Sequence, residues 1–232
     1  MPDEQSVAKT GGLLRSGIRA YQRVRDLAGR AIWGDAHTRR VFSRFYRRNV
    51  WSNAESRSGR SSTLAATDAV RKELPGLLAD LGARSMLDAP CGDFNWMRHL
   101  ELPLNRYVGA DIVGELIESN RTRFAREGRE FRVIDITNDS LPRVDVILCR
   151  DCLIHLSFDA IHAAIANFRR SGSTYLLTTT NTTSPGNRDV VVGDCFLLNL
   201  EKPPFDFPAP MRTLVESEVH GRSLGLWRIA DL

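Results

Sequence analysis

Cysteine is scarce in this chain, with four residues in 232, and their positions do not form the paired motifs of a metal site. Each of them lies in or beside an apolar run: Cys91, Cys149, Cys152 and Cys195. We therefore expect reduced thiols, buried in the protein, rather than a disulfide framework. No resident metal is predicted, and the expected location is the cytoplasm.

Long apolar runs are also absent. None approaches the roughly 20 residues that a helix needs to span a bilayer. The first five residues, Met1 to Gln5, are acidic and polar, unlike a secretory leader. The 232 residues suffice for one α/β core of ordinary size and a modest addition. We place the addition at residues 1–63 and the main domain at residues 64–232.

Positive charge is concentrated near the amino terminus. Residues 1–60 hold 13 Lys or Arg against 5 Asp or Glu, a balance of +8, so the rest carries −4 of the total of +4. Apolar residues recur here at helical spacing with arginines between them: Leu13, Leu14, Ile18, Tyr21, Val24 and Leu27. This pattern predicts a basic amphipathic helix over residues 13–30. It either packs on the main domain or a second subunit, or provides a surface for an anionic membrane or nucleic acid.

Four apolar runs in the main domain are each followed by polar or charged side chains. The first, at residues 85–88, leads into a tight turn at 89–93, and the others occupy residues 106–112, 131–136 and 144–149. Their alternation with helical segments predicts a parallel sheet with helices on both faces. Because the carboxyl ends of parallel strands meet at one edge of a sheet, we expect a ligand site at this edge.

The expected helices span residues 64–81, 96–100, 113–127 and 158–170, and the expected strands span residues 85–88, 107–111, 131–134, 144–149, 174–180, 196–200 and 223–229. Between the last two strands, prolines exclude a regular helix or an inner strand: Pro203, Pro204, Pro208 and Pro210. In this loop, Phe205 and Phe207 either form a wall of the ligand pocket or pack against the edge of the sheet.

The turn Asp88-Ala-Pro-Cys-Gly-Asp93, followed by Asp111 at the end of the second run, resembles the nucleotide-binding signature of class I S-adenosylmethionine (AdoMet) dependent methyltransferases. Only Gly92 stands where that family usually has two or three glycines, and Pro90-Cys91 replaces its more usual Gly-x pair. The resemblance covers roughly residues 85–232. It implies an α/β, Rossmann-like doubly wound sheet of seven strands, mostly parallel, with an antiparallel C-terminal hairpin, here joined to a helical N-terminal extension.

The resemblance also assigns residues to the cofactor AdoMet. The loop with Asp88, Pro90, Cys91, Gly92 and Asp93 is placed near the methionine half, with Trp96 and Arg150 close by. Asp111 and Ile112 are placed at the ribose, and Asp135 and Ile136 at the adenine.

The serine-rich segment 55–63 either is a disordered linker or serves as a lid over the cofactor. Ser62 or Thr63 is well placed to cap the helix expected from Leu64. A helix amino end with hydroxyls and a nearby guanidinium favours a carboxylate site. We therefore expect Arg57, Ser58 and Gly59 to hold the methionine carboxylate, which makes residues 1–63 both a basic extension and a cofactor lid.

The fourth apolar run is followed by two residues suited to proton transfer. His155 has a suitable intrinsic pKa for a base, and Asp151 lies four residues earlier. In the alternative, His155 bonds locally at a helix start and Asp151 is a structural acceptor. A metal held by Asp151 and Asn181 is disfavoured, because the second carboxylate expected beside Asn181 is missing.

We therefore predict an AdoMet-dependent enzyme that methylates a hydroxyl of a small molecule or glycan. A dinucleotide enzyme would need the G-x-G-x-x-G loop that Pro90 and Cys91 do not provide. An RNA or protein methyltransferase that docks its substrate on the basic extension, and a non-catalytic AdoMet-binding module, stay open as alternatives. We do not expect a nucleic-acid partner; a peripheral membrane contact through the basic helix and a homodimer are further partner predictions.

Overall fold

The computed structural model describes residues 24, 26, 28, 36–218 and 221–232. The chain divides into two compact units, Met1–Thr38 and Arg39–Leu232. In the first unit, His37 Nε2 lies 2.8 Å from Asp26 Oδ1, and both side chains are largely buried. The basic helix predicted over residues 13–30 lies almost entirely outside the described residues.

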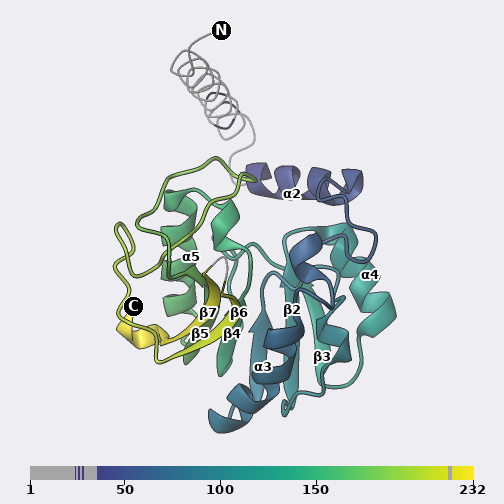
Figure 1. Cartoon of the computed structure of the whole chain (residues 1–232). Coiled ribbons are helices and arrows are strands. Elements are labelled where there is room, and N and C mark those ends of the chain that lie inside the picture. Colours follow the sequence, from purple (N-terminus) through teal and green to yellow (C-terminus); the bar gives the residue numbers. More distant parts are fainter. Residues whose placement is uncertain (1–23, 25, 27, 29–35, 219–220) are drawn as a thin grey trace, which may run out of the picture. The chain divides into compact units, whose positions relative to one another are not determined.

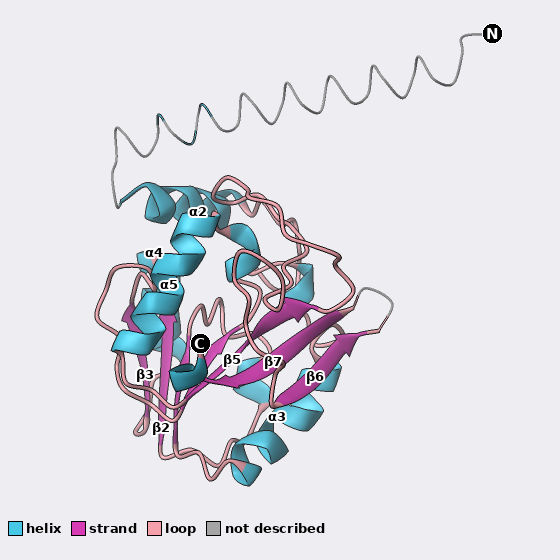
Figure 2. Cartoon of the chain, turned by 90° about the vertical axis from the view of Figure 1, so that its left-hand side faces the viewer, coloured by secondary structure: helices cyan, strands magenta, loops and turns pink. Residues whose placement is uncertain are grey.

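The second unit is built on one sheet of seven strands (Figures 1 and 2). In spatial order these are β3 (Arg129–Val133), β2 (Arg106–Asp111), β1 (Ser85–Asp88), β4 (Val146–Cys149), β5 (Tyr175–Asn181), β7 (Arg222–Arg228) and β6 (Arg212–Ser217). The first five pair in parallel, whereas β7 is antiparallel to both β5 and β6. The predicted fold class is therefore confirmed, including the antiparallel C-terminal hairpin.

The two faces of the sheet are covered differently. Helices α3 (Asp68–Asp80) and α4 (Gly114–Phe124) pack with Met86 and Leu148 on one face, whereas α5 (Phe158–Arg170) packs with Leu87 on the other. Alternate residues of a strand point to opposite faces, so each inner strand contributes to two buried clusters. Within the described part of the chain, no helix is long and apolar enough to cross a membrane.

The predicted strand at residues 196–200 is wrong. Phe196, Leu198 and Leu200 are buried and Leu197 is exposed, which is the alternation of a strand. Yet its three buried side chains join the same apolar cluster as α5, and its backbone accepts a single hydrogen bond from the end of β5, from Asn181 N to Leu198 O at 2.6 Å, without forming a strand of the sheet. The place of that strand in the hairpin is taken by β6 (Arg212–Ser217), which the sequence analysis missed.

Several element bounds also differ from those expected. α3 starts at Asp68, not at Leu64, because residues 60–67 form a short 3₁₀ turn and further turns in which Thr67 Oγ1 donates to Thr63 O at 2.8 Å. Neither Ser62 nor Thr63 caps α3, whose N-cap is Thr67 without a side-chain cap bond. α4 ends at Phe124, three residues before the predicted end.

Helix α2 (Ala36–Arg48) was not predicted at all. Its part in the second unit presents Val41 and Phe45 to Gly193, whose backbone has φ +89°. A Cβ at Gly193 would lie 2.9 Å from both side chains, so the glycine permits the close approach.

Candidate functional site

The loop after β1 crosses the carboxyl ends of β2 and β4. Ala89 N donates to Leu148 O at 2.9 Å, and Cys91 N donates to Ala110 O at 2.7 Å. Gly92 takes the left-handed conformation (φ +54°) that favours glycine, and its N–H donates to Asp111 Oδ2 at 3.3 Å. The loop and the end of β2 are therefore one hydrogen-bonded unit, as expected for a nucleotide-binding edge.

Two buried carboxylates lie at this edge. Burial raises the pKa of Asp88 to about 7, against the opposing effect of the hydrogen bond from Tyr107. Burial likewise raises the pKa of Asp111 to about 6, although backbone N–H groups of Val113 and Gly92 donate to it. Both groups therefore titrate close to neutral pH, where a ligand can change their ionisation.

Residues 55–63, which we call the strap, are bound to the loop through Asp93. Its Oδ1 accepts from Ser56 Oγ at 2.9 Å and from Ser58 Oγ at 3.2 Å, and its Oδ2 accepts from Arg57 N at 2.7 Å. Ser58 Oγ in turn accepts from Asp93 N at 2.9 Å. A Cβ at Gly92 would lie 2.3 Å from Ser58 Oγ, so the strap requires glycine there.

The strap also contacts the segment that follows α2. Gly59 has φ +98°, and a Cβ on it would lie 3.1 Å from Trp51 Cβ. The Arg57 guanidinium is exposed and stacks 5.4 Å from the centre of the Tyr46 ring. The backbone of Arg57 is thus fixed by Asp93, while its charged end is directed to α2.

The remaining predicted cofactor residues lie along the same edge of the sheet. Ile112 is partly buried just after β2, and Trp96 is buried under the Arg150 guanidinium, 5.6 Å from its ring centre. After β3, Asp135 is buried, and its Oδ1 accepts from Thr137 N and Oγ1 at 2.9 and 2.6 Å. Ile136 is buried beside it.

Past β4 the structure holds a cluster of four charged side chains, buried except for the partly exposed Arg222, which we call the charge cluster: Arg150, Asp151, Glu216 and Arg222. Arg150 Nε donates to Glu216 Oε1 at 2.7 Å, and Arg150 Nη1 lies 3.4 Å from Asp151 Oδ2. Arg222 Nη1 lies 3.5 Å from the same Asp151 oxygen, and Arg222 Nε lies 3.3 Å from Glu216 Oε2. Two cations balance two anions.

The two acids of the charge cluster differ in their pKa. Burial raises the pKa of Glu216, and its arginine neighbours do not fully offset this. For Asp151 burial acts in the same direction, but Arg150 and Arg222 outweigh it, so the pKa of Asp151 falls below its usual range. Asp151 is therefore ionised at neutral pH and is a weak proton acceptor.

His155 ends a short 3₁₀ turn (Leu153–His155) just past the charge cluster. Its Nδ1 lies 2.8 Å from Asp194 O. Because a carbonyl oxygen only accepts, Nδ1 carries the proton in the neutral ring and Nε2 has the free lone pair. The ring is half-buried and lies 6.1 Å from the Trp51 ring, centre to centre. This is the tautomer that a general base needs.

The structure thus brings several of the predicted residues into two groups, and Arg150 contacts both groups. The first contains the strap, the loop after β1 and Asp111; the second contains Asp151 and its charged partners. Sequence reasoning missed Ser56, Glu216 and Arg222. Ser56 belongs to the serine-rich segment already singled out, but no local signal marks Glu216 or Arg222, because they reach the site only through the pairing of β6 and β7.

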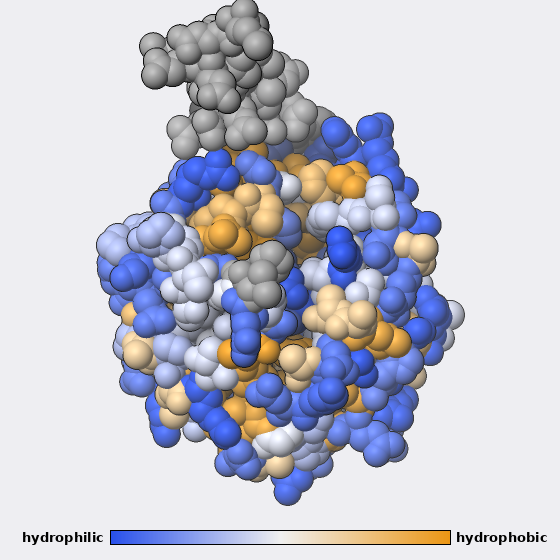
Figure 3. Space-filling view, viewed as in Figure 1, coloured by the Kyte–Doolittle hydropathy of each residue, from blue (hydrophilic) through white to orange (hydrophobic). Residues whose placement is uncertain are grey.

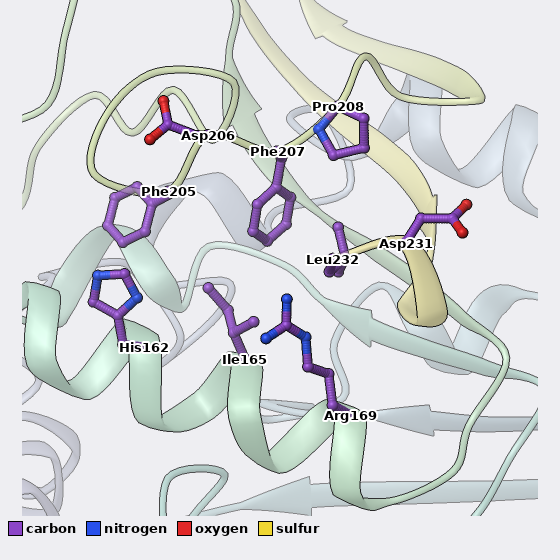
Figure 4. A pocket seen from close by; sticks show the side chains of 9 residues that line it. All are labelled: His162, Ile165, Arg169, Phe205, Asp206, Phe207, Pro208, Asp231 and Leu232. Carbon is purple, nitrogen blue, oxygen red and sulfur yellow. The ribbon is translucent and has the colours of Figure 1, made fainter.

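The aromatic residues of the proline loop lie elsewhere. Phe207 packs against Trp227 in the buried core with ring centres 5.4 Å apart, and Phe205 packs against Phe158 and His162. A pocket of about 130 Å³ lies here between α5 and the proline loop (Figure 4). Phe205 and Phe207 line this pocket, which contains none of the residues predicted for the cofactor or for proton transfer.

The face shown in Figure 3 is mostly hydrophilic, with apolar side chains in its upper part and in smaller groups in its centre and lower part. Among the residues that the structure describes, no group of three or more His, Cys, Asp or Glu side chains could hold a metal ion.

Comparison with known proteins finds a family model that is similar to part of this chain. Residues 87–177 match the family model described as a methyltransferase domain. A comparison with curated proteins finds no match.

Solved structures share the fold at low identity. N-methyltransferase NodS from Bradyrhizobium japonicum WM9, in complex with S-adenosylhomocysteine, is 15% identical over 79% of this chain and 97% of that chain, with a TM-score of 0.56. The 1,6-didemethyltoxoflavin-N1-methyltransferase of Burkholderia thailandensis is 18% identical over 82% and 86%, also with a TM-score of 0.56. The methyltransferase domain of bacterial CtHen1-CN is 10% identical over 70% and 99%, with a TM-score of 0.54.

Residues 87–177 are thus similar to a methyltransferase domain, within a sheet that extends through β6 and β7. The predicted fold is confirmed, and the matched segment agrees with the predicted enzyme class, an AdoMet-dependent methyltransferase.

Proposed function

We propose that this enzyme transfers the AdoMet methyl group to a hydroxyl of a small-molecule or glycan acceptor, with His155 as the base. The observation that carries the proposal is the Nδ1 contact to Asp194 O, 2.8 Å, which leaves Nε2 of His155 free to take a proton. Bound AdoMet supplies the electrophilic methyl group. The residues of this chain then have to align the acceptor, exclude water and remove the hydroxyl proton.

For the cofactor, we propose that Asp111 accepts the ribose hydroxyls and that the loop from Asp88 to Gly92 lies at the methionine half. Support comes from the carboxylate of Asp111, which is tied to the loop through Gly92 N. In this proposal the adenine lies near Asp135 and Ile136, with Ile112 and Trp96 as further contacts.

The strap is proposed as the cofactor lid, with Arg57, Ser58 and Gly59 at the methionine carboxylate. For Arg57 this proposal requires the guanidinium to leave the Tyr46 ring when the cofactor binds. It is supported by the bonds that Asp93 accepts from Ser56 Oγ and Arg57 N. In this view residues 1–63 are the basic extension and lid, and residues 64–232 are the methyltransferase domain.

A hydroxyl fits the acceptor side better than an ammonium group. The charge cluster holds two arginines and two carboxylates, so it offers no net negative charge to a cation. Asp151, with its lowered pKa, is suited to stabilise the imidazolium of His155 rather than to take the proton itself.

We propose a cytoplasmic setting, supported by the free thiol of the exposed Cys195, since reducing compartments keep such thiols reduced. We do not propose a nucleic-acid partner. A peripheral membrane contact through the basic N-terminal segment and a homodimer are partner proposals that rest on the charge and periodicity of residues 1–60.

The proposal can be tested by measuring the transfer of a labelled methyl group from AdoMet to a panel of hydroxylated small molecules and glycosides. His155→Ala should lower turnover roughly 10²-fold or more with unchanged AdoMet affinity, whereas the control His99→Ala, an exposed histidine, should leave both unchanged. Full activity of His155→Ala would exclude the base role. Loss of activity with a chelator would indicate a metal route instead, and transfer only to amines, RNA or protein would refute the hydroxyl acceptor. AdoMet binding without any transfer would favour a binding module.

A further inference from the structure

A β-bulge in β6 directs Glu216 into the charge cluster. The register of β6 on β7 shifts between Val215 and Ser217, so Glu216 is the extra residue. Its side chain is 0% exposed; the exposure that the residue retains belongs to its backbone. Bulges commonly re-aim a side chain next to an active site.

The Glu216 carboxylate accepts a hydrogen bond from the Arg150 guanidinium, which also contacts three other residues. Arg150, 4% exposed, donates from Nε to Glu216 Oε1 at 2.7 Å and from Nη2 to Ser61 O at 2.8 Å. Its Nη1 lies 3.4 Å from Asp151 Oδ2, and its plane lies over Trp96. Arg150 therefore links the hairpin, the strap and the acceptor-side carboxylate.

Stability alone is a poor reason for this arrangement. Replacing buried ion pairs by apolar side chains is often neutral or stabilising. The charge cluster also leaves Asp151 Oδ2, Glu216 Oε2 and Arg222 Nε buried without a hydrogen bond, which is costly. In addition, Asp151 has φ +50°, a left-handed conformation that non-glycine residues rarely adopt. Such strain is typical of sites where geometry serves function.

We propose that Glu216 is a positioning residue that fixes the Arg150 guanidinium. Because Arg150 contacts both the strap and Asp151, the closed strap and the orientation of the Asp151 carboxylate then depend on each other. The coupling to catalysis rests on the proposed function. The attachment of the strap through Arg150 and Ser61 O does not.

The test compares Glu216→Gln with Glu218→Gln, an exposed glutamate on the same hairpin. Without AdoMet, trypsin cleavage at Arg57 and Arg60, quantified by mass spectrometry, should be at least threefold faster in Glu216→Gln than in Glu218→Gln. Cleavage at Arg126, an exposed arginine outside the strap, reports general unfolding and should be equal in the two proteins.

A double-mutant cycle separates positioning from packing. If Glu216 acts through Arg150, the variant Arg150→Gln/Glu216→Gln should be cleaved in the strap as fast as Arg150→Gln alone. With an accepted substrate, Glu216→Gln should lower kcat about tenfold. Strap cleavage unchanged from the control, or raised equally at Arg126, would overturn the inference.

The design also covers a variant that does not fold and a failure of the proposed reaction. If Glu216→Gln does not fold, Glu216→Met, which fills the same volume without charge, takes its place under the same criteria. Strap cleavage in the absence of ligand needs neither cofactor nor acceptor. Specific loosening of the strap without any methyl transfer would therefore keep the attachment and reject the proposed reaction.

Discussion

In the proposed cofactor site, the burial of Asp111 affects its pKa and therefore the expected binding of the ribose. Its carboxylate accepts backbone N–H groups on both sides, yet burial still raises its pKa to about 6. A raised pKa means that the folded protein holds the proton up to pH 6. Ribose hydroxyls that donate to the carboxylate favour its ionised form. Cofactor binding should therefore lower the pKa of Asp111 and release its proton.

We therefore expect AdoMet affinity to depend on pH through Asp111. The affinity for AdoMet should fall about tenfold as the pH decreases from 7 to 5, because the ionised fraction of Asp111, with a pKa of about 6, falls by that factor. Calorimetry at several pH values measures this. Asp111→Asn should bind more weakly and lose the part of the pH dependence centred near pH 6, leaving any contribution of Asp88 near pH 7. Asp159→Asn, on the exposed first turn of α5, should keep the full pH dependence. A pH-independent wild type would exclude Asp111 as the ribose acceptor.

At the scale of elements, one side chain, Asp93, holds the middle of the strap. Asp93 accepts from Ser56, Arg57 and Ser58, so three consecutive residues are held by a single carboxylate. Hydrogen bonds to a charged group contribute about 1.5–3 kcal/mol each. The strap should therefore open locally when this carboxylate is removed, while the sheet stays folded.

Limited proteolysis can measure the opening of the strap. In the wild type, AdoMet should slow trypsin cleavage at Arg57 and Arg60, because the cofactor adds contacts to the strap. Asp93→Ala should raise cleavage without cofactor and reduce the protection that AdoMet provides. Equal cleavage of the wild type with and without AdoMet would show that the strap is not a lid.

The segment 196–200 provides a matched pair for stability. Leu198 is 1% exposed on the α5 face of the sheet and Leu197 is 61% exposed. Leu198→Ala should lower the free energy of unfolding by about 2–5 kcal/mol, and Leu197→Ala by less than about 0.5 kcal/mol. Denaturant unfolding measures both. Similar values would mean that the segment does not cover the core.

For the molecule as a whole, charge is distributed unevenly, with +8 in residues 1–60 and −4 in the rest. If the basic segment contacts a membrane, the full chain should sediment with anionic vesicles and not with neutral ones. Binding should weaken between 50 and 300 mM salt, because screening shortens the reach of exposed charges. Size-exclusion chromatography on the same sample tests the homodimer. Equal binding to both vesicle types, or to neither, would refute the membrane contact.

Much of the fold could be predicted from local patterns. Met86 and Leu87 in the first run, and residues 146–149 in the fourth, are apolar without alternation, which is typical of inner parallel strands covered on both faces. The helix at residues 158–170 was predicted with its observed bounds because its amphipathic period and its N-cap Ser157 agree. Acidic residues that end apolar runs, such as Asp88 and Asp111, were expected at one edge of the sheet, because parallel strands present their carboxyl ends together. The structure places both there, at the edge where we propose the cofactor site.

Other features depend on contacts between residues far apart in the chain. Alternating burial in Phe196 to Leu200 is the same for a strand and for a segment lying on a sheet, so only the partner decides between them. Glu216 meets Arg150, 66 residues away, because β7 inserts between β5 and β6 and a bulge turns the side chain inward. Periodicity records which side of an element is buried but not what covers it, so the charge cluster and the attachment of the strap were set by tertiary packing alone.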